Sequence, residues 1–263
     1  MFGSGAVLGP RPAFTMTEDR IPLLAHRGFA AHYPENTLLS LRRAIDGGVQ
    51  AVEFDIQLSA DRLPVLMHDA SLSRTCGVDA LVWDLGSDRL RLLGAGEPER
   101  LGRTFEAERV PTLDEAVALL RQHPSVAVFA EVKKESVGRF GTVAVLEAVL
   151  PALEPLAEAG NPCVVISFVE TVLYEVRQRA PLPIGWCLSE YDDAARTRAQ
   201  ALSPEYLLAN HRHVPTDMPL WSGPWQWVIY EVVDTVLARR LVAQGATMIE
   251  TMDPPALAWG RLE

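Results

Sequence analysis

The stretch Ala51-Val52-Glu53-Phe54-Asp55-Ile56-Gln57-Leu58 decides the fold of this chain. Its mainly apolar character predicts a strand buried in a parallel sheet. Side chains alternate along a strand, so Glu53 and Asp55 project from the same face. Two carboxylates within an apolar run are costly to bury unless a cation holds them, and a hard divalent cation with oxygen ligands is the natural partner. We expect a metal site here; the alternative is an exposed strand end paired with arginines.

Similar apolar runs continue on both sides of this strand and alternate with longer amphipathic stretches. The predicted strands are Ile21–Ala25, Ala51–Leu58, Pro64–Met67, Val126–Val132, Cys163–Phe168, Leu182–Leu188, Tyr206–Asn210, Gln226–Val232 and Thr247–Glu250. The predicted helices include Asn36–Asp46, Leu113–Gln122, Thr142–Glu158, Thr171–Arg179 and Asp234–Ala243. Alternation of this kind indicates βαβ units. With 263 residues, the chain has a normal length for one α/β TIM barrel, (β/α)₈.

Nine predicted strands are one too many for an eight-stranded barrel. Only a short turn joins Ala51–Leu58 to Pro64–Met67, too short for a helical crossover, so one of them leaves the pattern or both share one region of the sheet. The pattern then breaks from Ala70 to Arg109, which predicts a small insertion packed over the barrel top. We expect a flexible tail at 1–20 and a barrel domain at 21–260 with an insertion at about 70–110. After it, Thr112 and Glu115 predict a capping box at a helix start.

The composition constrains the partners of the chain. Its formal net charge of -10 disfavours nucleic acid and anionic membranes, because both are bound by lysines and arginines that neutralise phosphates. No run reaches the roughly 18 apolar residues of a membrane span, and we expect neither a signal peptide nor stable membrane insertion. The three cysteines are scattered, which argues against disulfides and a zinc site. We therefore expect a cytoplasmic protein; the oligomeric state is unknown from the sequence.

Two histidines follow predicted strands. His26-Arg27-Gly28 follows the first strand, and His68-Asp69 follows Pro64–Met67. Histidine suits general acid–base work near neutral pH, and the planar fork of Arg27 suits phosphate oxygens. Asp69 either orients a histidine or caps the turn, and the turn is the favoured interpretation.

Glu131 and Lys133 lie two residues apart at the end of another predicted strand, so they share one face. Glu131 would complete a set of three carboxylates around the metal. Lys133 would bring a compact positive charge close to a phosphate. A purely structural Glu–Lys pair is the alternative. Because the carboxyl ends of barrel strands converge, these segments are expected to meet.

Taken together, the ordered motifs resemble the glycerophosphodiester phosphodiesterase family. The carrying segments are His26-Arg27-Gly28, Pro34-Glu35-Asn36-Thr37, Glu53-Phe54-Asp55, Pro64-Val65 with His68-Asp69, Pro111-Thr112-Leu113, Glu131-Val132-Lys133, Ile166-Ser167-Phe168 and Gly245…Ile249…Thr251…Asp253-Pro254. Each is weak evidence alone, but the ordered set covers roughly Leu23 to Pro254 and is highly specific.

The resemblance implies a TIM barrel in which Pro64–Met67 is an extra strand ahead of the insertion. It also implies site roles: His26 and His68 as the acid–base pair, Arg27 and Lys133 as phosphate contacts. By the same similarity Glu53, Asp55 and Glu131 would hold one Mg²⁺ or Ca²⁺. Glu35 and Asn36 would shape the site rather than react.

The sequence departs from the family pattern in two places. Tyr230 is followed by Glu231-Val232-Val233 where members commonly carry a Thr-Val-Asn-like segment, which puts a fourth carboxylate near the mouth of the site. Asp61-Arg62 replaces the usual Asp-Gly and changes only a turn. Trp225, Trp227 and Tyr230 are candidates for the pocket lining, although about half of such aromatic residues belong to the core.

The resemblance implies metal-dependent hydrolysis of a small glycerophosphodiester to glycerol 3-phosphate and an alcohol. Two alternatives stay open. One is a related phosphodiesterase acting on lysolipids, such as a lysophospholipase D or sphingomyelinase D, which the lack of a basic amphipathic stretch disfavours. The other is a catalytically silent barrel that binds a phosphorylated ligand, an interpretation that Glu231 keeps open.

Overall fold

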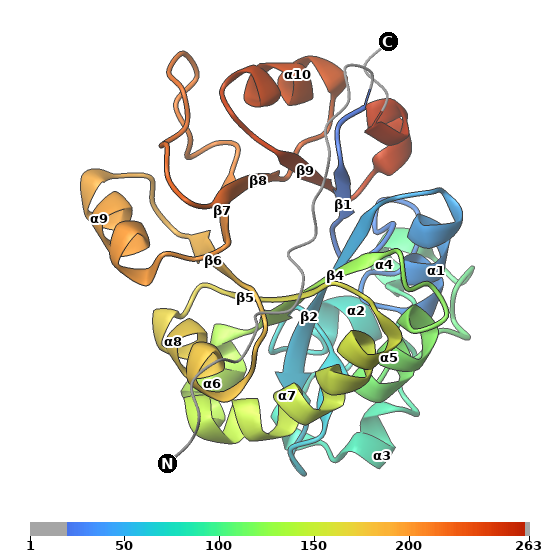
Figure 1. Cartoon of the computed structure of the whole chain (residues 1–263). Coiled ribbons are helices and arrows are strands. Elements are labelled where there is room, and N and C mark those ends of the chain that lie inside the picture. Colours follow the sequence, from blue (N-terminus) through green and yellow to red (C-terminus); the bar gives the residue numbers. More distant parts are fainter. Residues whose placement is uncertain (1–19, 261–263) are drawn as a thin grey trace.

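Eight parallel strands form a closed ring in the computed structural model, which describes residues 20–260 (Figure 1). Hydrogen-bonded neighbours run in the order β1-β9-β8-β7-β6-β5-β4-β2, and a β1–β2 pairing closes the ring. The ring strands are β1 (Leu23–Ala25), β2 (Ala51–Leu58), β4 (Ala127–Val132), β5 (Cys163–Ser167), β6 (Ile184–Leu188), β7 (Tyr206–Asn210), β8 (Gln226–Tyr230) and β9 (Met248–Thr251). This confirms the predicted TIM barrel. The tail predicted at 1–20 lies almost wholly outside the described residues.

The ninth predicted strand is β3 (Pro64–Leu66), and it is not part of the ring. It pairs antiparallel with the end of β2, so that Leu66 faces Ile56. A short turn can join antiparallel strands but not parallel ones, which explains why this pair needs no helix between its members.

Helices surround the ring, as Figure 1 shows. They are α1 (Leu38–Asp46), α5 (Leu113–Leu120), α6 (Lys134–Phe140), α7 (Thr142–Ala159), α8 (Glu170–Arg179), α9 (Asp193–Leu202), α10 (Thr235–Ala243) and the 3₁₀ helix η2 (Pro254–Gly260). The predicted capping box opens α5: Glu115 N donates to Thr112 Oγ1, and Thr112 N donates to Glu115 Oε2. Among the described helices, none is both long and apolar enough to cross a lipid bilayer.

Two helices, α6 and α9, were not predicted from the sequence. The buried face of α9 consists of Ala195, Ala199 and Leu202, which give little contrast in hydrophobicity along the chain. Helix α6 is short and contains Gly138. A buried face of small side chains and a short segment with an internal glycine are both weak sequence signals for a helix.

Alternation along the strands separates two apolar cores. On β2, the residues Val52, Phe54 and Ile56 pack outward in the core beneath the helices. The alternate positions of the ring point inward, and there Ala51, Phe129 and their neighbours form a second apolar cluster. Phe129 meets Tyr206 edge-on with ring centroids 5.1 Å apart. The barrel interior is therefore filled, and inward residues nearer the carboxyl ends of the strands lie above this apolar layer.

The insertion between β3 and α5 contains four short helices, α2 (Ser73–Cys76), η1 (Val82–Asp84), α3 (Ser87–Leu90) and α4 (Pro98–Leu101). Its apolar residues form a cluster of their own: Val65, Met67, Leu72, Val82, Leu90, Ala95 and Val110. Arg100 donates to the backbone oxygens of Ala31 and Tyr33, so the insertion is fastened to the loop between β1 and α1.

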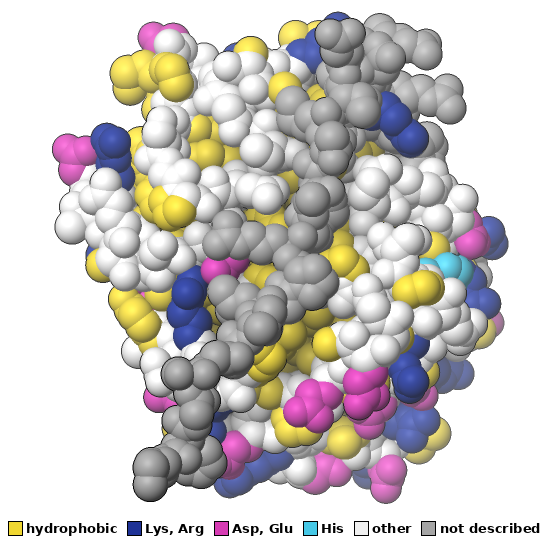
Figure 2. All heavy atoms as spheres, viewed as in Figure 1, with side chains coloured by type: hydrophobic (Ala, Val, Ile, Leu, Met, Phe, Trp, Pro, Cys, Tyr) yellow, Lys and Arg dark blue, Asp and Glu magenta, His cyan; other side chains and the backbone are white. Residues whose placement is uncertain are grey.

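Charges of both signs are mixed on the face shown in Figure 2, mainly around its rim, while apolar side chains gather toward the middle. No large single-sign field covers this face in the part of the chain that is described.

Candidate active site

Sheet register brings the three predicted carboxylates together. In the parallel pair of β2 and β4, Asp55 lies directly opposite Glu131, and alternation places Glu53 on the same inward face. One carboxylate oxygen from each of Glu53, Asp55 and Glu131 lies within 4.8 Å of the others. All three side chains are buried. Their convergence follows from the backbone, because neighbouring strands hold the residues at fixed positions.

Crowding of buried carboxylates changes their affinity for protons. Burial, together with the charge of Asp55, raises the pKa of Glu53 well above its ordinary value and raises that of Glu131 to about 7. Burial would also raise the pKa of Asp55, but the charges of Lys133 and Arg27 hold it below its usual range. Asp55 is therefore the permanently charged member of the group.

Lys133 sits between two of these carboxylates. Its Nζ atom lies 3.1 Å from Asp55 Oδ1 and 2.8 Å from Glu131 Oε1. Burial lowers the affinity of the ammonium group for its proton, but the two carboxylates outweigh burial and raise its pKa. The structure thus contains the Glu–Lys pair considered as an alternative in the sequence. The expected phosphate contact stays a prediction, since both roles are possible for one buried ammonium.

The carboxylate group fits a divalent cation on two counts. Glu53 Oε1 is buried and accepts a hydrogen bond from no described residue, which is costly unless a cation lies against it. Moreover, four buried carboxylates, Glu53, Asp55, Glu131 and Glu250, are matched in this group by the cationic Arg27 and Lys133. With all four carboxylates ionised, the excess of two negative charges would equal the charge of one divalent ion, which would take the place of the protons that the crowded carboxylates otherwise bind. An all-oxygen donor set is typical of Mg²⁺ or Ca²⁺ sites.

His26 lies beside this group at the end of β1. Its Nε2 atom is 3.9 Å from Glu53 Oε2 and 4.0 Å from Glu250 Oε1. Burial, followed by the charge of Arg27, lowers the pKa of His26 well below its ordinary value, so the neutral imidazole is favoured. A neutral, buried imidazole is suited to accept a proton.

Glu250 was not recognised in the sequence as a site residue. It lies in β9 and is buried within reach of His26 and Glu53. The only available signal was a charged residue inside the short predicted strand Thr247–Glu250. Strand β9 pairs Glu250 with Leu24 of β1, so the register of the closed ring decides its position.

Arg27 is held in a left-handed backbone conformation with φ 54°. Its backbone N–H donates to Glu53 Oε2, its Nη1 donates to Glu35, and its Nε lies 3.3 Å from Asp55 Oδ2. The neighbouring Gly28 has φ 77°, and a Cβ there would overlap Ser40. Positive φ at a non-glycine residue is strained and persists only where the surrounding contacts hold it, as these three contacts hold Arg27.

Asn36 also has a positive φ, 55°, and contacts the carboxylate group. Its Nδ2 donates to Asp55 Oδ2, while the backbone N–H of Asp55 donates to Asn36 Oδ1. This closed pair of hydrogen bonds fixes the Asp55 side chain. Glu35 and Asn36 thus contact Arg27 and Asp55, respectively, and their expected role in shaping the site stays a prediction.

His68 follows β3 and is more open than His26, with its side chain 32% exposed. Its Nδ1 lies 2.6 Å from Asp69 Oδ1. The sequence favoured a turn-capping role for Asp69, and this interpretation was wrong, because its carboxylate is directed to His68 and Arg74. Two adjacent residues in a sequence do not reveal whether their side chains touch, because that contact depends on the rotamers.

A cavity of about 210 Å³ connects most of the predicted residues. Its lining includes His26, Arg27, His68, Glu131 and Lys133, together with Phe168, Asn210, Tyr230, Glu231 and Glu250. Tyr230 thus lines the cavity as the sequence suggested, whereas Trp225 and Trp227 pack in the core beneath the helices. The two histidines and the two positively charged side chains, Arg27 and Lys133, therefore face one common space.

Glu231 stands at the edge of this cavity, directly after β8. It has a positive φ of 61°, and its Oε2 accepts a hydrogen bond from Asn210 Nδ2. It also lines a neighbouring cavity of about 600 Å³ that shares Arg27 with the first. The fourth carboxylate expected near the mouth is thus present, without an ion pair to any described residue.

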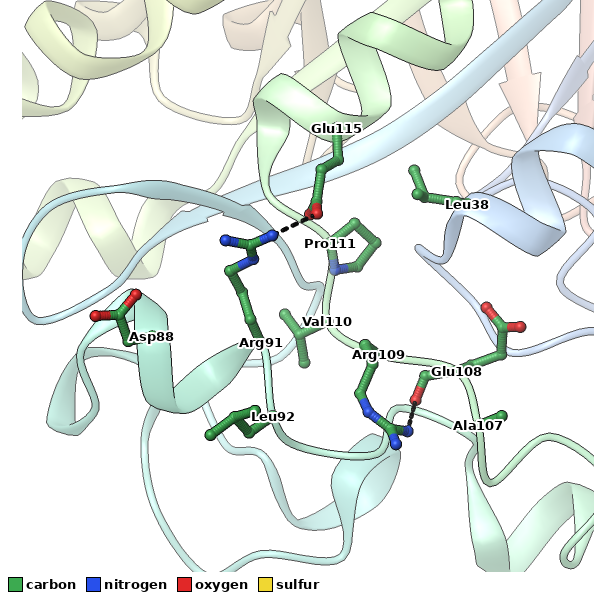
Figure 3. Close-up of a pocket in the computed structure, with 10 residues that line it drawn as sticks. All are labelled: Leu38, Asp88, Arg91, Leu92, Ala107, Glu108, Arg109, Val110, Pro111 and Glu115. Atoms are coloured by element: carbon green, nitrogen blue, oxygen red, sulfur yellow. Dashed lines mark hydrogen bonds and ion pairs between the residues drawn. The ribbon is translucent and has the colours of Figure 1, made fainter.

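A separate hollow of about 560 Å³ lies between the insertion and helices α1 and α5 (Figure 3). Both of its arginines have partners: Arg91 Nη2 lies 2.8 Å from Glu115 Oε1, and Arg109 donates to the backbone oxygen of Glu108. None of the seven predicted site residues lines this hollow. The larger volume of this hollow therefore does not identify it as the active site. The cavity of about 210 Å³ that contains the two histidines is the better candidate.

Comparison with known proteins agrees with this geometry. The family model described as "Glycerophosphoryl diester phosphodiesterase family" matches residues 26–251. The glycerophosphodiester phosphodiesterase of Caldanaerobacter subterraneus subsp. tengcongensis is 30% identical over 241 residues, covering 89% of this chain and 95% of that protein. Human glycerophosphodiester phosphodiesterase 1 is 36% identical over 160 residues, covering 61% of this chain and 46% of that protein. The match thus spans about half the length of that relative.

A solved structure is also similar. It is an Oleispira antarctica phosphodiesterase in complex with its product sn-glycerol-3-phosphate, with a TM-score of 0.81 and 26% sequence identity. The superposition covers 91% of this chain and 96% of that one.

Proposed function

Because the chain belongs to the glycerophosphoryl diester phosphodiesterase family, we propose that it hydrolyses glycerophosphodiesters to glycerol 3-phosphate and an alcohol. The observation that carries this proposal is the convergence of predicted site residues from three separate segments on one cavity. His26, Arg27, His68, Glu131 and Lys133 all line it. A relative of this fold holds sn-glycerol-3-phosphate, which supports the same product here.

Glu53, Asp55 and Glu131 are proposed to hold one Mg²⁺ or Ca²⁺. When bound, such a cation would draw negative charge away from the phosphate. Arg27 and Lys133 are proposed to contact the phosphate oxygens and to stabilise the charge of the pentacoordinate transition state. Carboxylates already hold both of these side chains in place, so little reorganisation is needed when the substrate enters.

His26 is proposed as the general base. Its buried, neutral imidazole accepts the proton of the attacking oxygen, and the negative charge of Asp55 then stabilises the imidazolium. His68 is proposed as the general acid. Asp69, 2.6 Å from its Nδ1, orients the ring and leaves the other ring nitrogen for the leaving alcohol.

The proposal is tested by measuring release of glycerol 3-phosphate from several glycerophosphodiesters, using chelator-treated protein with Mg²⁺, Mn²⁺ or Ca²⁺ added back. Lysophosphatidylcholine, assayed in parallel with glycerophosphocholine, separates the lysolipid alternative. Absence of hydrolysis with every cation, together with measurable binding of glycerol 3-phosphate, would favour a silent binding barrel.

His26→Ala and His68→Ala are each expected to lower kcat by about 10²-fold or more, because each removes one proton-transfer group. Both variants should keep the circular-dichroism spectrum and the Tm of the parent, since neither histidine belongs to an apolar cluster. Near-normal turnover in both variants would refute the acid–base assignment.

A further inference from the structure

We propose that Arg74, on helix α2 of the insertion, is a positioning residue that sets the orientation of both His68 and Arg27. The inference rests on the function proposed above and extends it to a residue outside the barrel. Arg74 itself does not line the cavity that contains the two histidines. It acts through two carboxylates, one on each side of the site.

The first carboxylate is that of Asp69. Arg74 Nε donates to Asp69 Oδ2 at 2.7 Å, while Asp69 Oδ1 lies 2.6 Å from His68 Nδ1. One oxygen is thus fixed by Arg74, and the other is presented to the imidazole. Without the guanidinium, the Asp69 side chain, which is about a third exposed, is free to rotate toward solvent. The orientation of His68 therefore depends on Arg74.

The second carboxylate is that of Glu35. Arg74 Nη1 and Nη2 donate to its two oxygens at 2.8 and 2.6 Å, a bidentate pair. Arg27 Nη1 donates to the same carboxylate at 3.1 Å and its Nε lies near Asp55. Arg27 is therefore shared between Glu35 and Asp55. If Arg74 is removed, Glu35 has fewer competing donors and should draw Arg27 away from Asp55 and the phosphate position.

Only an arginine has the geometry to do this. The planar guanidinium places Nε on one carboxylate and the Nη1/Nη2 edge on the other, whereas a lysine offers a single ammonium on a flexible stem. An exposed ion pair contributes little to stability, but the Glu35 side chain is only 6% exposed. The arrangement is thus built for orientation rather than for surface solubility.

The rest of the insertion supports the same loop by a different route. Glu97 accepts a hydrogen bond from the backbone N–H of Glu35, and Arg100 pairs with Glu97 and donates to Ala31 and Tyr33. These contacts hold the backbone, whereas Arg74 mainly holds side chains: its hydrogen bonds go to Asp69 and Glu35, and only its Nη1 approaches Glu97 Oε2, at 3.9 Å. Stability and catalytic orientation are therefore separable by mutation.

The experiment compares Arg74→Gln and Arg74→Lys with Asp69→Asn and with the double variant Arg74→Gln/Asp69→Asn. Arg103→Gln is the matched control, because Arg103 is an exposed insertion arginine paired with Glu106 alone in the described structure. Asp69→Asn should lower kcat with KM nearly unchanged. Arg74→Gln should lower kcat about 10- to 100-fold and also raise KM, since it removes the contacts to both Asp69 and Glu35 and so disturbs His68 and Arg27 together. The control should keep the parent kinetics.

The energetic coupling between the substitutions at Arg74 and Asp69 distinguishes a positioning role of Arg74 from general support of the fold. If Arg74 acts on kcat through Asp69, the double variant is hardly slower than the slower single variant. Additive losses would overturn the proposal, as would parent-like kcat and KM in a folded Arg74→Gln protein or full recovery by lysine. If Arg74→Gln does not fold, the kinetics of Arg74→Lys decide the same question. An inactive parent protein would instead sink the proposed function.

Discussion

The barrel side of the cavity and its insertion side hold their functional groups in different ways. On the barrel side, Glu53, Asp55 and Glu131 project from paired strands and are almost wholly buried. On the insertion side, His68 and Asp69 are about a third exposed and are oriented by hydrogen bonds between side chains. Strand register fixes the first group, and rotamers fix the second.

This difference indicates how each side responds to change. A carboxylate on a strand stays close to the other charged groups when a neighbouring residue is substituted. A substitution there therefore changes the net charge of the site. A side chain in the insertion network can rotate, so the site loses orientation rather than charge. Barrel substitutions should therefore act on the cation and on the chemistry together, and insertion substitutions mainly on turnover.

The largest expected difference is between two matched substitutions, Asp55→Asn on the barrel side and Asp69→Asn on the insertion side. Asp55→Asn removes the permanently charged carboxylate and should lower kcat/KM by about 10²- to 10³-fold. Asp69→Asn should cost only about 10-fold, because it leaves the charges around the cation intact. Steady-state kinetics at several cation concentrations provides the measurement. Equal losses in both variants would contradict the division into two sides.

Cation binding should depend on pH through the barrel side. Burial raises the pKa of Glu131 from its ordinary 4.5 to about 7 in the cation-free protein, so the folded state binds a proton that the unfolded state releases. By linkage, this group stabilises the cation-free fold at low pH, and that contribution is lost as pH rises from about 4.5 to about 7. A cation displaces the proton and should therefore raise the Tm more at pH 7.5 than at pH 5.5.

Differential scanning calorimetry of chelator-treated protein, with and without Mg²⁺ or Ca²⁺, checks this expectation. Glu131→Gln, which cannot titrate, serves as the control and should show a smaller change with pH. A cation-induced rise in Tm that is independent of pH in the parent would break the link between the crowded carboxylates and cation binding.

The smallest expected effect concerns Glu231, which borders both the site and the adjoining cavity. Its carboxylate has no ion pair among the described residues, so a substrate alcohol with a positive charge should benefit from it. Glu231→Asn should lower kcat/KM for glycerophosphocholine relative to glycerophosphoinositol by about 5-fold, or roughly 1 kcal/mol for a solvent-facing charge pair. An unchanged ratio would show that Glu231 does not select the alcohol.

Much of the fold could be predicted because its signals are local. The apolar runs located every strand of the ring, and β7 was predicted with its observed bounds, Tyr206–Asn210. The capping box of Thr112 and Glu115 needed only three residues of spacing. Helix α9 escaped because its buried face is made largely of alanines. Small buried side chains in α9, and the short length and internal glycine of α6, separated these two helices from the predicted ones.

The candidate site divides in the same way. The motifs named seven residues, and strand alternation alone put Glu53 beside Asp55 on one face. Glu250 escaped because only closure of the ring, with β9 against β1, brings it next to His26. The partnership of Asp69 with His68 and Arg74 escaped as well, because it depends on side-chain rotamers and on packing of the insertion.

The sequence by itself determined the class of fold, the order of the strands and the residue types at their carboxyl ends, because periodicity and motif spacing are properties of neighbouring residues. Tertiary structure alone decided which of those residues share a space. Ring closure placed Glu250 against His26, and docking of the insertion placed Arg74 between Asp69 and Glu35. Such contacts join residues far apart in the chain, and their energy depends on distances that only the folded backbone sets.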